Sequence, residues 1–412
     1  MESSAILALA LLSVGYATIS ARLDRSPISA PMAFMVFGLV LGPHVLDVVG
    51  VSLRSEGFRS LAELALTLVL FSQASRSNLR ALITRRALPA RLLGVGLPLT
   101  MILGTILALV VLPSLTLWEA AVLAVVLAPT DAALGQAVVS DPRVPAYIRR
   151  SLDAESGLND GIALPFLTIA IAFAEQESGG GSLGHWTWFT VKTIGISVLV
   201  GAAIGYIGGR TFTAARASKT MGDHWTEIAV LTLAVASFVA VDQLDGSGFV
   251  GAFVAGIAFG AVAPKIVVRR ETTVDTVGQL LVLWVFALFG AEAIWPAFEH
   301  VDTQMLLYAV SSLTIVRMAP VAVALAGGGF SRASTAYLGW FGPRGTASII
   351  FALVVVEESE LPATSLIVQV VAVTVTLSVI AHGLSAHPGA AAYARAVGRL
   401  RGRTPAAPEL AA

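Results

Sequence analysis

The stretch AVLAVVLAPTDAALGQAVV, residues 121–139, decides the fold because it is an apolar run of membrane length that is interrupted at its centre. Pro129 removes a backbone donor and clashes with the preceding turn, so a helix is predicted to break there. Thr130 and Asp131 follow directly. An ionisable group inside a span costs roughly 3 kcal/mol on insertion scales and is usually functional or paired. The stretch therefore predicts a broken membrane helix with a polar site at the break.

A second run, STAYLGWFGPRGTASIIFALVV at residues 334–355, has Gly342, Pro343 and Gly345 at its centre, with Arg344 among them. It is predicted to break for the same reason. In the order of spans given below, the two broken runs are spans 5 and 12. Spans 5 and 12 are seven spans apart, and because this number is odd they cross the membrane in opposite directions. Spans 1–6 and 8–13 are therefore predicted to be inverted repeats. Paired interrupted helices in two halves of a chain indicate a transporter's binding site.

The composition agrees with a membrane protein. The chain has 412 residues, of which 56% are hydrophobic and 13% charged, whereas soluble domains carry about 25% charged residues. The apolar runs are continuous rather than alternating, which excludes a β-barrel. The absence of cysteine from the sequence excludes disulfides, thiolate metal sites and cysteine nucleophiles. The fold class predicted is therefore an all-α polytopic membrane protein.

Apolar runs between polar breaks predict thirteen transmembrane helices, since a bilayer core needs about 20 apolar residues as helix. Residues 1–387 are predicted to form a single transmembrane unit, followed by a short cytoplasmic tail at 388–412. The first run lacks the basic region of a signal peptide and is read as a retained span. The predicted spans are 3–21, 28–46, 60–75, 92–112, 118–139, 151–174, 188–209, 225–243, 248–263, 276–295, 304–325, 334–356 and 365–386.

The distribution of basic residues predicts the orientation. With the N-terminus outside, the cytoplasmic loops and tail hold 21 of the 26 Lys and Arg, the outer loops hold three, and two lie inside spans. This split obeys the positive-inside rule and requires an odd number of spans. The C-terminus is therefore predicted to be cytoplasmic.

Span 6 carries the segment DAESGLNDGIALP, residues 153–165. Within a helix, Glu155 shares a face with Asn159, and Ser156 shares a face with Asp160, because residues four apart are neighbours. A hard cation such as Na⁺ prefers carboxylate, hydroxyl and carbonyl oxygens. The ion-binding shell predicted is Asp131, Asp160, Ser156, Thr130 and one carbonyl freed by the helix break.

Three membrane acids, Asp131, Glu155 and Asp160, face two membrane arginines, Arg317 and Arg344. One carboxylate charge is left over for a cation or a proton. In the structural alternative, Asp131 and Asp160 are each bound in a salt bridge with one of the arginines. For Glu155 we expect a buried pair with Arg317. Arg344 is expected to face the negative end of one half-helix and neutralise it.

Two weaker patterns are interpreted structurally. Repeated GxxxG spacing at Gly201, Gly205 and Gly209 predicts close helix packing within the chain. The histidines lie near span ends or in loops without ligand spacing, so they are expected to be interfacial residues; they are His44, His185, His224, His300, His382 and His387.

Three motifs, in this order, resemble those of the bacterial cation:proton antiporters of the NhaP type. The resemblance covers the chain from the first span to the last. The motifs are APTDAALGQAVVSDPRVP at 128–145, IRRSLDAESGLNDGIALP at 148–165 and GWFGPRGTASIIFAL at 339–353.

The resemblance implies two crossed broken helices in a six-helix core domain that moves against a dimerisation domain. The core would comprise spans 4–6 and 11–13, and the dimerisation domain spans 1–3 and 7–10; their ranges are 92–174 with 304–386, and 3–75 with 188–295. It also implies a homodimer in the bacterial inner membrane.

The resemblance also implies residue roles. Asp160 would be the main ion and proton carrier, and Asn159 would brace the first helix break. Relatives with two adjacent aspartates are generally electrogenic, whereas the Asn159-Asp160 pair is similar to that of the electroneutral one-for-one exchangers. The other roles implied are completion of the shell by Asp131, Thr130 and Ser156, charge balance by Arg344, and a tie between spans 6 and 11 by Glu155 with Arg317.

The sequence therefore predicts a secondary Na⁺(Li⁺)/H⁺ antiporter, not an enzyme, in which cation and proton compete for one carboxylate site. K⁺/H⁺ exchange on the same scaffold stays open, because ion selectivity depends on sub-ångström shell geometry. An intramembrane aspartyl protease would also use two membrane aspartates, but a GxGD stretch is missing and the arginines disfavour a proton-sharing dyad. An organic-anion symporter would have a less acidic site. No cofactor and no nucleic-acid partner are expected.

Overall fold

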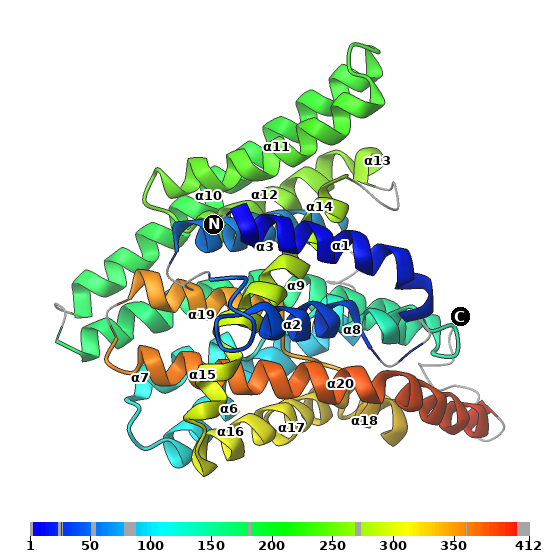
Figure 1. Cartoon of the computed structure of the whole chain (residues 1–412). Helices are drawn as coiled ribbons and strands as arrows, with labels where there is room; N and C mark the ends of the chain where they lie inside the picture. Colours follow the sequence, from blue (N-terminus) through cyan, green and yellow to red (C-terminus); the bar gives the residue numbers. More distant parts are fainter. Residues whose placement is uncertain are drawn as a thin grey trace.

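The protein is all-helical in its computed structural model, which describes residues 3–23, 26, 28–50, 55–77, 88–179, 183–267, 273–359 and 361–401 (Figure 1). No strand occurs within these ranges, which confirms the all-α prediction. The helices are α1 Ser3–Leu23, α2 Ala30–Leu41, α3 Glu56–Arg76, α5 Leu88–Arg91, the π-helical turn η1 Leu92–Gly96, α6 Leu97–Val111, α7 Leu117–Val126, α8 Ala132–Val139, α9 Ala146–Glu177, α10 Leu183–Ala217, α11 Asp223–Asp242, α12 Gly248–Val262, α13 Pro264–Val267, α14 Thr273–Glu292, α15 Ile294–Glu299, α16 Thr303–Leu313, α17 Ile315–Leu325, α18 Arg332–Trp340, α19 Thr346–Glu358 and α20 Thr364–Arg401.

Many of these helices have the length and composition of membrane spans. Among the described residues, eight meet both criteria: Ser4–Leu23, Leu88–Val111, Ala146–Glu177, Gly184–Ala217, Asp223–Asp242, Thr273–Glu292, Thr303–Leu325 and Thr364–Gly398. Shorter apolar helices lie at Ala30–Leu41, Leu117–Val126, Gly248–Val262 and Thr346–Val356. The protein is thus a multi-pass membrane protein, while the count of thirteen spans and the orientation of the termini stay predictions.

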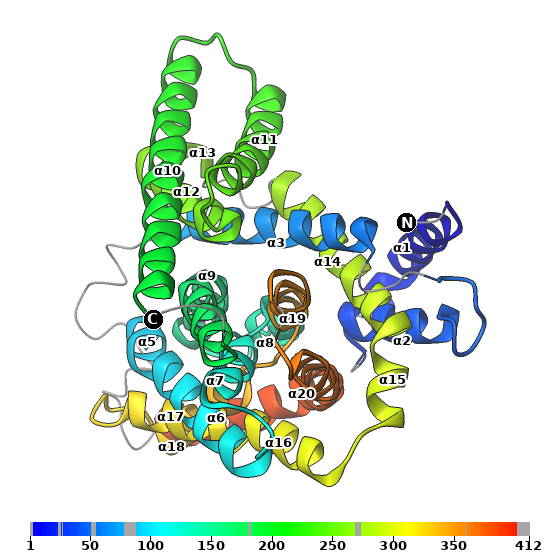
Figure 2. The same cartoon turned by 90° about the vertical axis from the view of Figure 1, so that its left-hand side faces the viewer.

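The helices pack in two groups, which Figure 2 separates. One group contains α6, α7, α9 and α16 to α20, where α6 contacts α7, α7 contacts α9, and α16 contacts α20. The other contains α2, α3, α10 to α12 and α14, where α12 contacts α3 and α10, and α14 contacts α2 and α3. The predicted division into core and dimerisation domains and the relative movement of the two domains stay predictions.

Small residues let helices of the second group approach closely. A Cβ atom at Gly201 of α10 would overlap the backbone of Gly251 in α12, and one at Gly205 would overlap the backbone of Ala255. Such spacing is typical of tightly packed membrane helices. The GxxxG repeat therefore serves packing within the chain.

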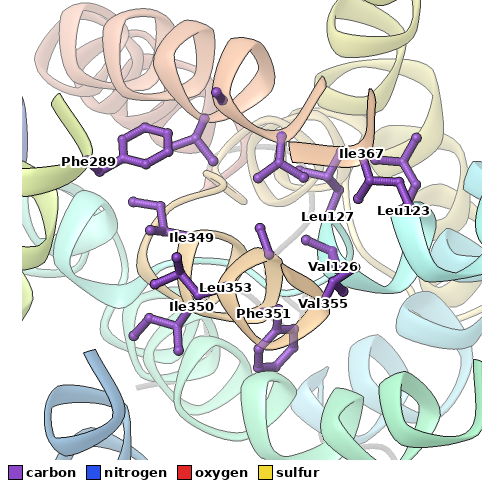
Figure 3. Close-up of a cluster of buried hydrophobic side chains, with 14 of the residues drawn as sticks. Leu123, Val126, Leu127, Phe289, Ile349, Ile350, Phe351, Leu353, Val355 and Ile367 are labelled. Carbon is purple, nitrogen blue, oxygen red and sulfur yellow. The ribbon is translucent and has the colours of Figure 1, made fainter. Parts of the chain in front are cut away.

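Helix α19 belongs to the first group and lies on the side of that group that faces the second (Figure 2). It contacts α3, α7, α9, α14 and α20, and a helix that is apolar all round is expected to be enclosed in this way. Figure 3 shows Phe351 and Val355 of α19 close to Val126 of α7, and Ile349 on the side of Phe289 of α14; these side chains are buried. The half-helix that follows the second break is therefore held rigidly.

Helix α20 continues past the predicted boundary at residue 387 and reaches Arg401. Pro388 does not end it. Beyond the proline, the Tyr393 hydroxyl is 2.8 Å from Ser334 Oγ of α18, and the Tyr393 ring stacks on that of Tyr337 at 4.2 Å. These contacts fix the end of α20 against α18. Residues 402–412 of the predicted tail lie outside the described residues.

Candidate functional site

The two predicted helix breaks meet each other. Residues 127–131 separate α7 from α8, and residues 341–345 separate α18 from α19. The backbone N–H of Asp131 donates to the carbonyl of Pro343 at 2.7 Å. The unwound segments therefore cross, which places backbone groups of both inside the protein.

The carboxylate of Asp131 joins the beginnings of two half-helices. Oδ1 accepts from the Leu134 N–H at 2.8 Å at the start of α8, and Oδ2 accepts from the Thr346 N–H at 2.5 Å at the start of α19. A helix N-terminus carries partial positive charge and free N–H donors, so a carboxylate is stabilised there. A Cβ atom at Gly345 would collide with this carboxylate. The Asp131 carboxylate therefore occupies space that is free only because residue 345 is glycine.

Asp131 lies at helix N-termini, whereas Arg344 lies next to a helix C-terminus. Its Nη1 donates to the carbonyls of Ala128 at 2.6 Å and Pro129 at 3.0 Å, just past the C-terminus of α7. The side chain is fully buried. Among the described residues no carboxylate lies within ion-pair distance of Arg344, so the alternative of a salt bridge with Asp131 or Asp160 is not what the structure contains. The guanidinium instead faces the negative end of a half-helix.

Thr130, Ser156 and Asn159 form a buried chain of polar side chains between the first break and α9. Asn159 Nδ2 donates to Thr130 Oγ1 at 2.6 Å, and Thr130 Oγ1 is 3.0 Å from Ser156 Oγ. Asn159 thereby links α9 to the break. The two hydroxyl oxygens are held next to each other.

Asp160 is buried on the same face of α9 as Ser156. Within the described part of the chain, its Oδ1 has no hydrogen-bond partner. The carboxylate is also near enough to Asp131 for their charges to interact. A buried polar atom without a partner is costly unless something else satisfies it. This oxygen is therefore available to a proton or a cation.

Glu155 and Arg317 form a buried ion pair between α9 and α17. Arg317 Nη1 lies 2.6 Å from Glu155 Oε1, and both side chains are 2% exposed. Arg317 also approaches the Leu338 carbonyl of α18 at 3.5 Å. A Cβ atom at Gly342 would clash with the guanidinium. The pair thus ties three elements together beside the second break.

A small pocket lies between α8, α9 and the second break. Ser156 belongs to its wall, and so does Asp153, an exposed acid one turn earlier in α9. Sequence reasoning missed Asp153, although its position three residues before Ser156 was the available signal. The remaining lining residues are Gly135, Val138, Val139, Leu152, Phe341 and Pro343.

The prediction that all histidines are interfacial is wrong for His382. Its side chain is buried in α20, with Nε2 2.8 Å from the Trp340 carbonyl at the end of α18. The error has a physical source: the span was predicted to end at residue 386, whereas α20 runs on to Arg401. His382 therefore lies well inside the helix.

Comparisons with known proteins agree with this geometry. The family described as "Sodium/hydrogen exchanger, transmembrane" matches residues 8–391. The chain is 24% identical to the K(+)/H(+) antiporter NhaP of Alkalimonas amylolytica over 346 residues, which are 82% of this chain and 58% of that protein. It is 26% identical to the Na(+)/H(+) antiporter NhaH of Halobacillus dabanensis over 302 residues, which are 70% of this chain and 72% of that protein.

The fold also matches a solved structure. The sodium proton antiporter MjNhaP1 from Methanocaldococcus jannaschii superimposes with a TM-score of 0.75 at 19% identity, covering 95% of this chain and 98% of that chain. The fold is therefore shared. The chain spans 58%, 35% and 42% of the length of three curated relatives, the Alkalimonas protein among them.

Proposed function

The chain belongs to the sodium/hydrogen exchanger family, and from this premise we propose that it exchanges Na⁺ or Li⁺ for H⁺ across a membrane. The observation that carries the proposal is the buried Asp160 Oδ1, which has no hydrogen-bond partner among the described residues. The hydroxyls of Thr130, on the break, and Ser156, one turn before Asp160 on α9, lie 3.0 Å from each other. Carboxylate and hydroxyl oxygens suit a hard monovalent cation.

Charge balance supports a site that holds one cation or one proton. Arg317 neutralises Glu155 at 2.6 Å. Arg344 is the other buried arginine in the described part of the chain, and it stands against two carboxylates, Asp131 and Asp160. One negative charge is therefore left in a dry region, where an unpaired charge is strongly disfavoured. Binding of either ion removes it, so Na⁺ and H⁺ exclude each other at Asp160.

This exclusion couples the two fluxes when the site faces each side of the membrane in turn. In the proposed cycle, the core domain, residues 92–174 and 304–386, moves against the dimerisation domain, residues 3–75 and 188–295. A loaded site crosses in either form, and an empty charged site does not. In this cycle, the pocket that has Ser156 in its wall marks the side from which an ion enters.

Three further features belong to the proposal. The exchange is electroneutral, one cation for one proton, because Asn159 occupies the position beside Asp160 where electrogenic relatives carry a second acid. The protein acts as a homodimer in a bacterial inner membrane. Its N-terminus lies outside and its C-terminus in the cytoplasm, as the distribution of Lys and Arg favours.

K⁺/H⁺ exchange is the second candidate, because one relative that matches 82% of the chain is named a K(+)/H(+) antiporter. Both candidates use the same carboxylates. They differ in the size of the shell around Asp160 and in which cation the shell fits.

Purified protein in acid-loaded liposomes with a trapped pH dye tests both candidates. Addition of Na⁺ or Li⁺ should alkalinise the interior at rates well above those with choline, and the rate with K⁺ decides between the candidates. An electroneutral cycle should run at the same rate under an imposed membrane potential.

Asp160→Asn is the loss-of-function variant, and Asp242→Asn, an exposed acid at the end of α11, is the matched control. Alkalinisation by Na⁺, Li⁺ and K⁺ that is no faster than with choline contradicts the proposal. Equal activity of both variants contradicts the role of Asp160.

A further inference from the structure

A buried cluster of side chains on α20 faces the second helix break and has no role in the ion shell. His382 Nε2 lies 2.8 Å from the carbonyl of Trp340, the last residue of α18. Ser378 Oγ accepts from the backbone N–H of Arg344 at 2.7 Å, four residues further along the break. Ser378 and His382 are one turn apart and lie 3.2 Å from each other. Together they contact both edges of the unwound segment.

The partners determine how the protons are arranged. A carbonyl only accepts, so His382 Nε2 carries a proton and donates it to Trp340. Ser378 Oγ receives the Arg344 N–H and can donate its own proton to His382 Nδ1. In a neutral ring Nδ1 accepts from Ser378 Oγ at 3.2 Å; Nδ1 also lies 2.9 Å from the Ser378 carbonyl, to which it donates only when it carries a proton. A satisfied buried network rigidifies its surroundings.

The side chains around this network are also fixed. The His382 ring stacks on the Trp340 ring with centroids 5.0 Å apart, and Trp340 Nε1 donates to Ser385 Oγ at 2.9 Å. On its other side, Arg344 reaches the carbonyls of Ala128 and Pro129 in the first break. A shift of the Arg344 backbone would therefore move the contact between the two breaks.

We propose that Ser378 and His382 are positioning residues that hold the second break open and keep Arg344, and through it the first break, in the geometry that the ion site needs. Neither residue touches the transported ion. The histidine acts as a neutral hydrogen-bonding group rather than as a switch of charge. The positive groups that act on it are Arg317 and Arg344.

One readout of this inference is independent of transport. Hydrogen–deuterium exchange of the peptide containing Arg344 measures how often the break opens. Ser378→Ala removes the acceptor of the Arg344 amide, and exchange there should accelerate about tenfold, as for one lost hydrogen bond. His387→Leu, on the same helix and outside the network, should leave the exchange rate unchanged.

The second readout is transport, and it rests on the proposed function. His382→Leu and Ser378→Ala should raise the KM for Na⁺ about tenfold, because a looser break leaves the shell less organised. His382→Gln, whose amide offers one donor and one acceptor, should restore the KM to within about twofold and keep the wild-type pH profile.

The outcomes separate the two proposals. Unchanged exchange of the Arg344 amide in Ser378→Ala overturns the positioning role, and this holds even if His382→Leu fails to fold. If His382→Leu has the same KM for Na⁺ as His382→Gln, the ring only fills space. If the pH profile of His382→Gln is flatter than that of the wild type, His382 titrates. Either result overturns the inference. Accelerated amide exchange in a protein that exchanges no cation leaves the positioning role in place and refutes the proposed function instead.

Discussion

Replacement of Arg317 by alanine should destabilise the protein by about 3–5 kcal/mol, because it leaves the Glu155 charge buried without its partner. The two side chains are 2.6 Å apart and 2% exposed, so water cannot take the place of the lost guanidinium without rearrangement. A tenfold change in an equilibrium constant corresponds to about 1.4 kcal/mol. The folding equilibrium should therefore shift by roughly a hundredfold to a few thousandfold.

The assay is equilibrium unfolding of the purified protein in mixed micelles, with far-UV circular dichroism as the signal. Arg59→Ala is the matched control, because Arg59 pairs with Glu63 at 2.7 Å but is 47% exposed. An exposed pair at this spacing contributes about 0.3–0.5 kcal/mol. The free-energy loss of Arg317→Ala should thus be about tenfold larger than that of Arg59→Ala.

A double variant separates charge from packing. Glu155→Leu combined with Arg317→Met removes both charges at similar volume and should recover most of the lost stability. An Arg317→Ala variant as stable as the parent would show that the pair does not support the fold. A double variant as unstable as Arg317→Ala would assign the loss to packing around Gly342 instead.

Three further predictions concern ions and pH. Asp160→Asn should abolish the Na⁺-driven pH change in liposomes, because the carboxylate that alternates between the two ions is gone, and its melting temperature should stay close to that of the parent. Robust exchange by this variant contradicts the role of Asp160 as the single carrier. The plot of exchange rate against pH should be bell-shaped. Its acidic limb should move to lower pH as the Na⁺ concentration rises, because a cation that outcompetes the proton lowers the apparent pKa of the coupled site. An acidic limb that stays fixed over about a hundredfold change in Na⁺ concentration shows that cation and proton use separate sites. Outside the membrane, hydrogen bonds from the side chain and backbone N–H of Arg143 lower the pKa of Asp141 below its ordinary value. Stabilisation by this pair should therefore be complete above about pH 4, the pKa of an aspartate in the unfolded chain, and should disappear as the pH falls through the lower pKa of Asp141 in the folded protein. In Asp141→Asn, the melting temperature should depend less on pH over this range. A variant whose melting temperature falls with acid as in the wild type refutes the assignment.

The helix breaks and their residues could be predicted from the sequence because proline and charge are local signals. Pro129 and Pro343 interrupt apolar runs, and an ionisable residue, Asp131 or Arg344, lies within two positions of each. The fold class followed from the same runs, since only helices satisfy their own backbone within a continuous apolar segment. The predicted Glu155–Arg317 contact is likewise present, because charge arithmetic left Arg317 few partners.

The partners of the polar groups at the crossing could not be derived in the same way. Asp131 was predicted as an ion ligand, yet both its oxygens bond to helix N–H groups, one of them 215 residues away. No sequence pattern relates Thr346 to Asp131, because the contact exists only once two distant helices cross. His382 was misplaced for a related reason, since its partner, the Trp340 carbonyl, is a backbone atom freed by the second break.

The double attachment of Asp131 has a consequence for attempts to redesign which cation the protein carries. A library that varied every predicted shell position equally would lose many members at Asp131, because a side chain there without an acceptor oxygen removes the caps of α8 and α19 together with a predicted ligand. Thr130 and Ser156 bond through their hydroxyls to other side chains and not to helix ends. Diversity concentrated at Ser156 and Thr130, with Asp131 and Gly345 kept constant, offers the shortest mutational route from one alkali cation to another.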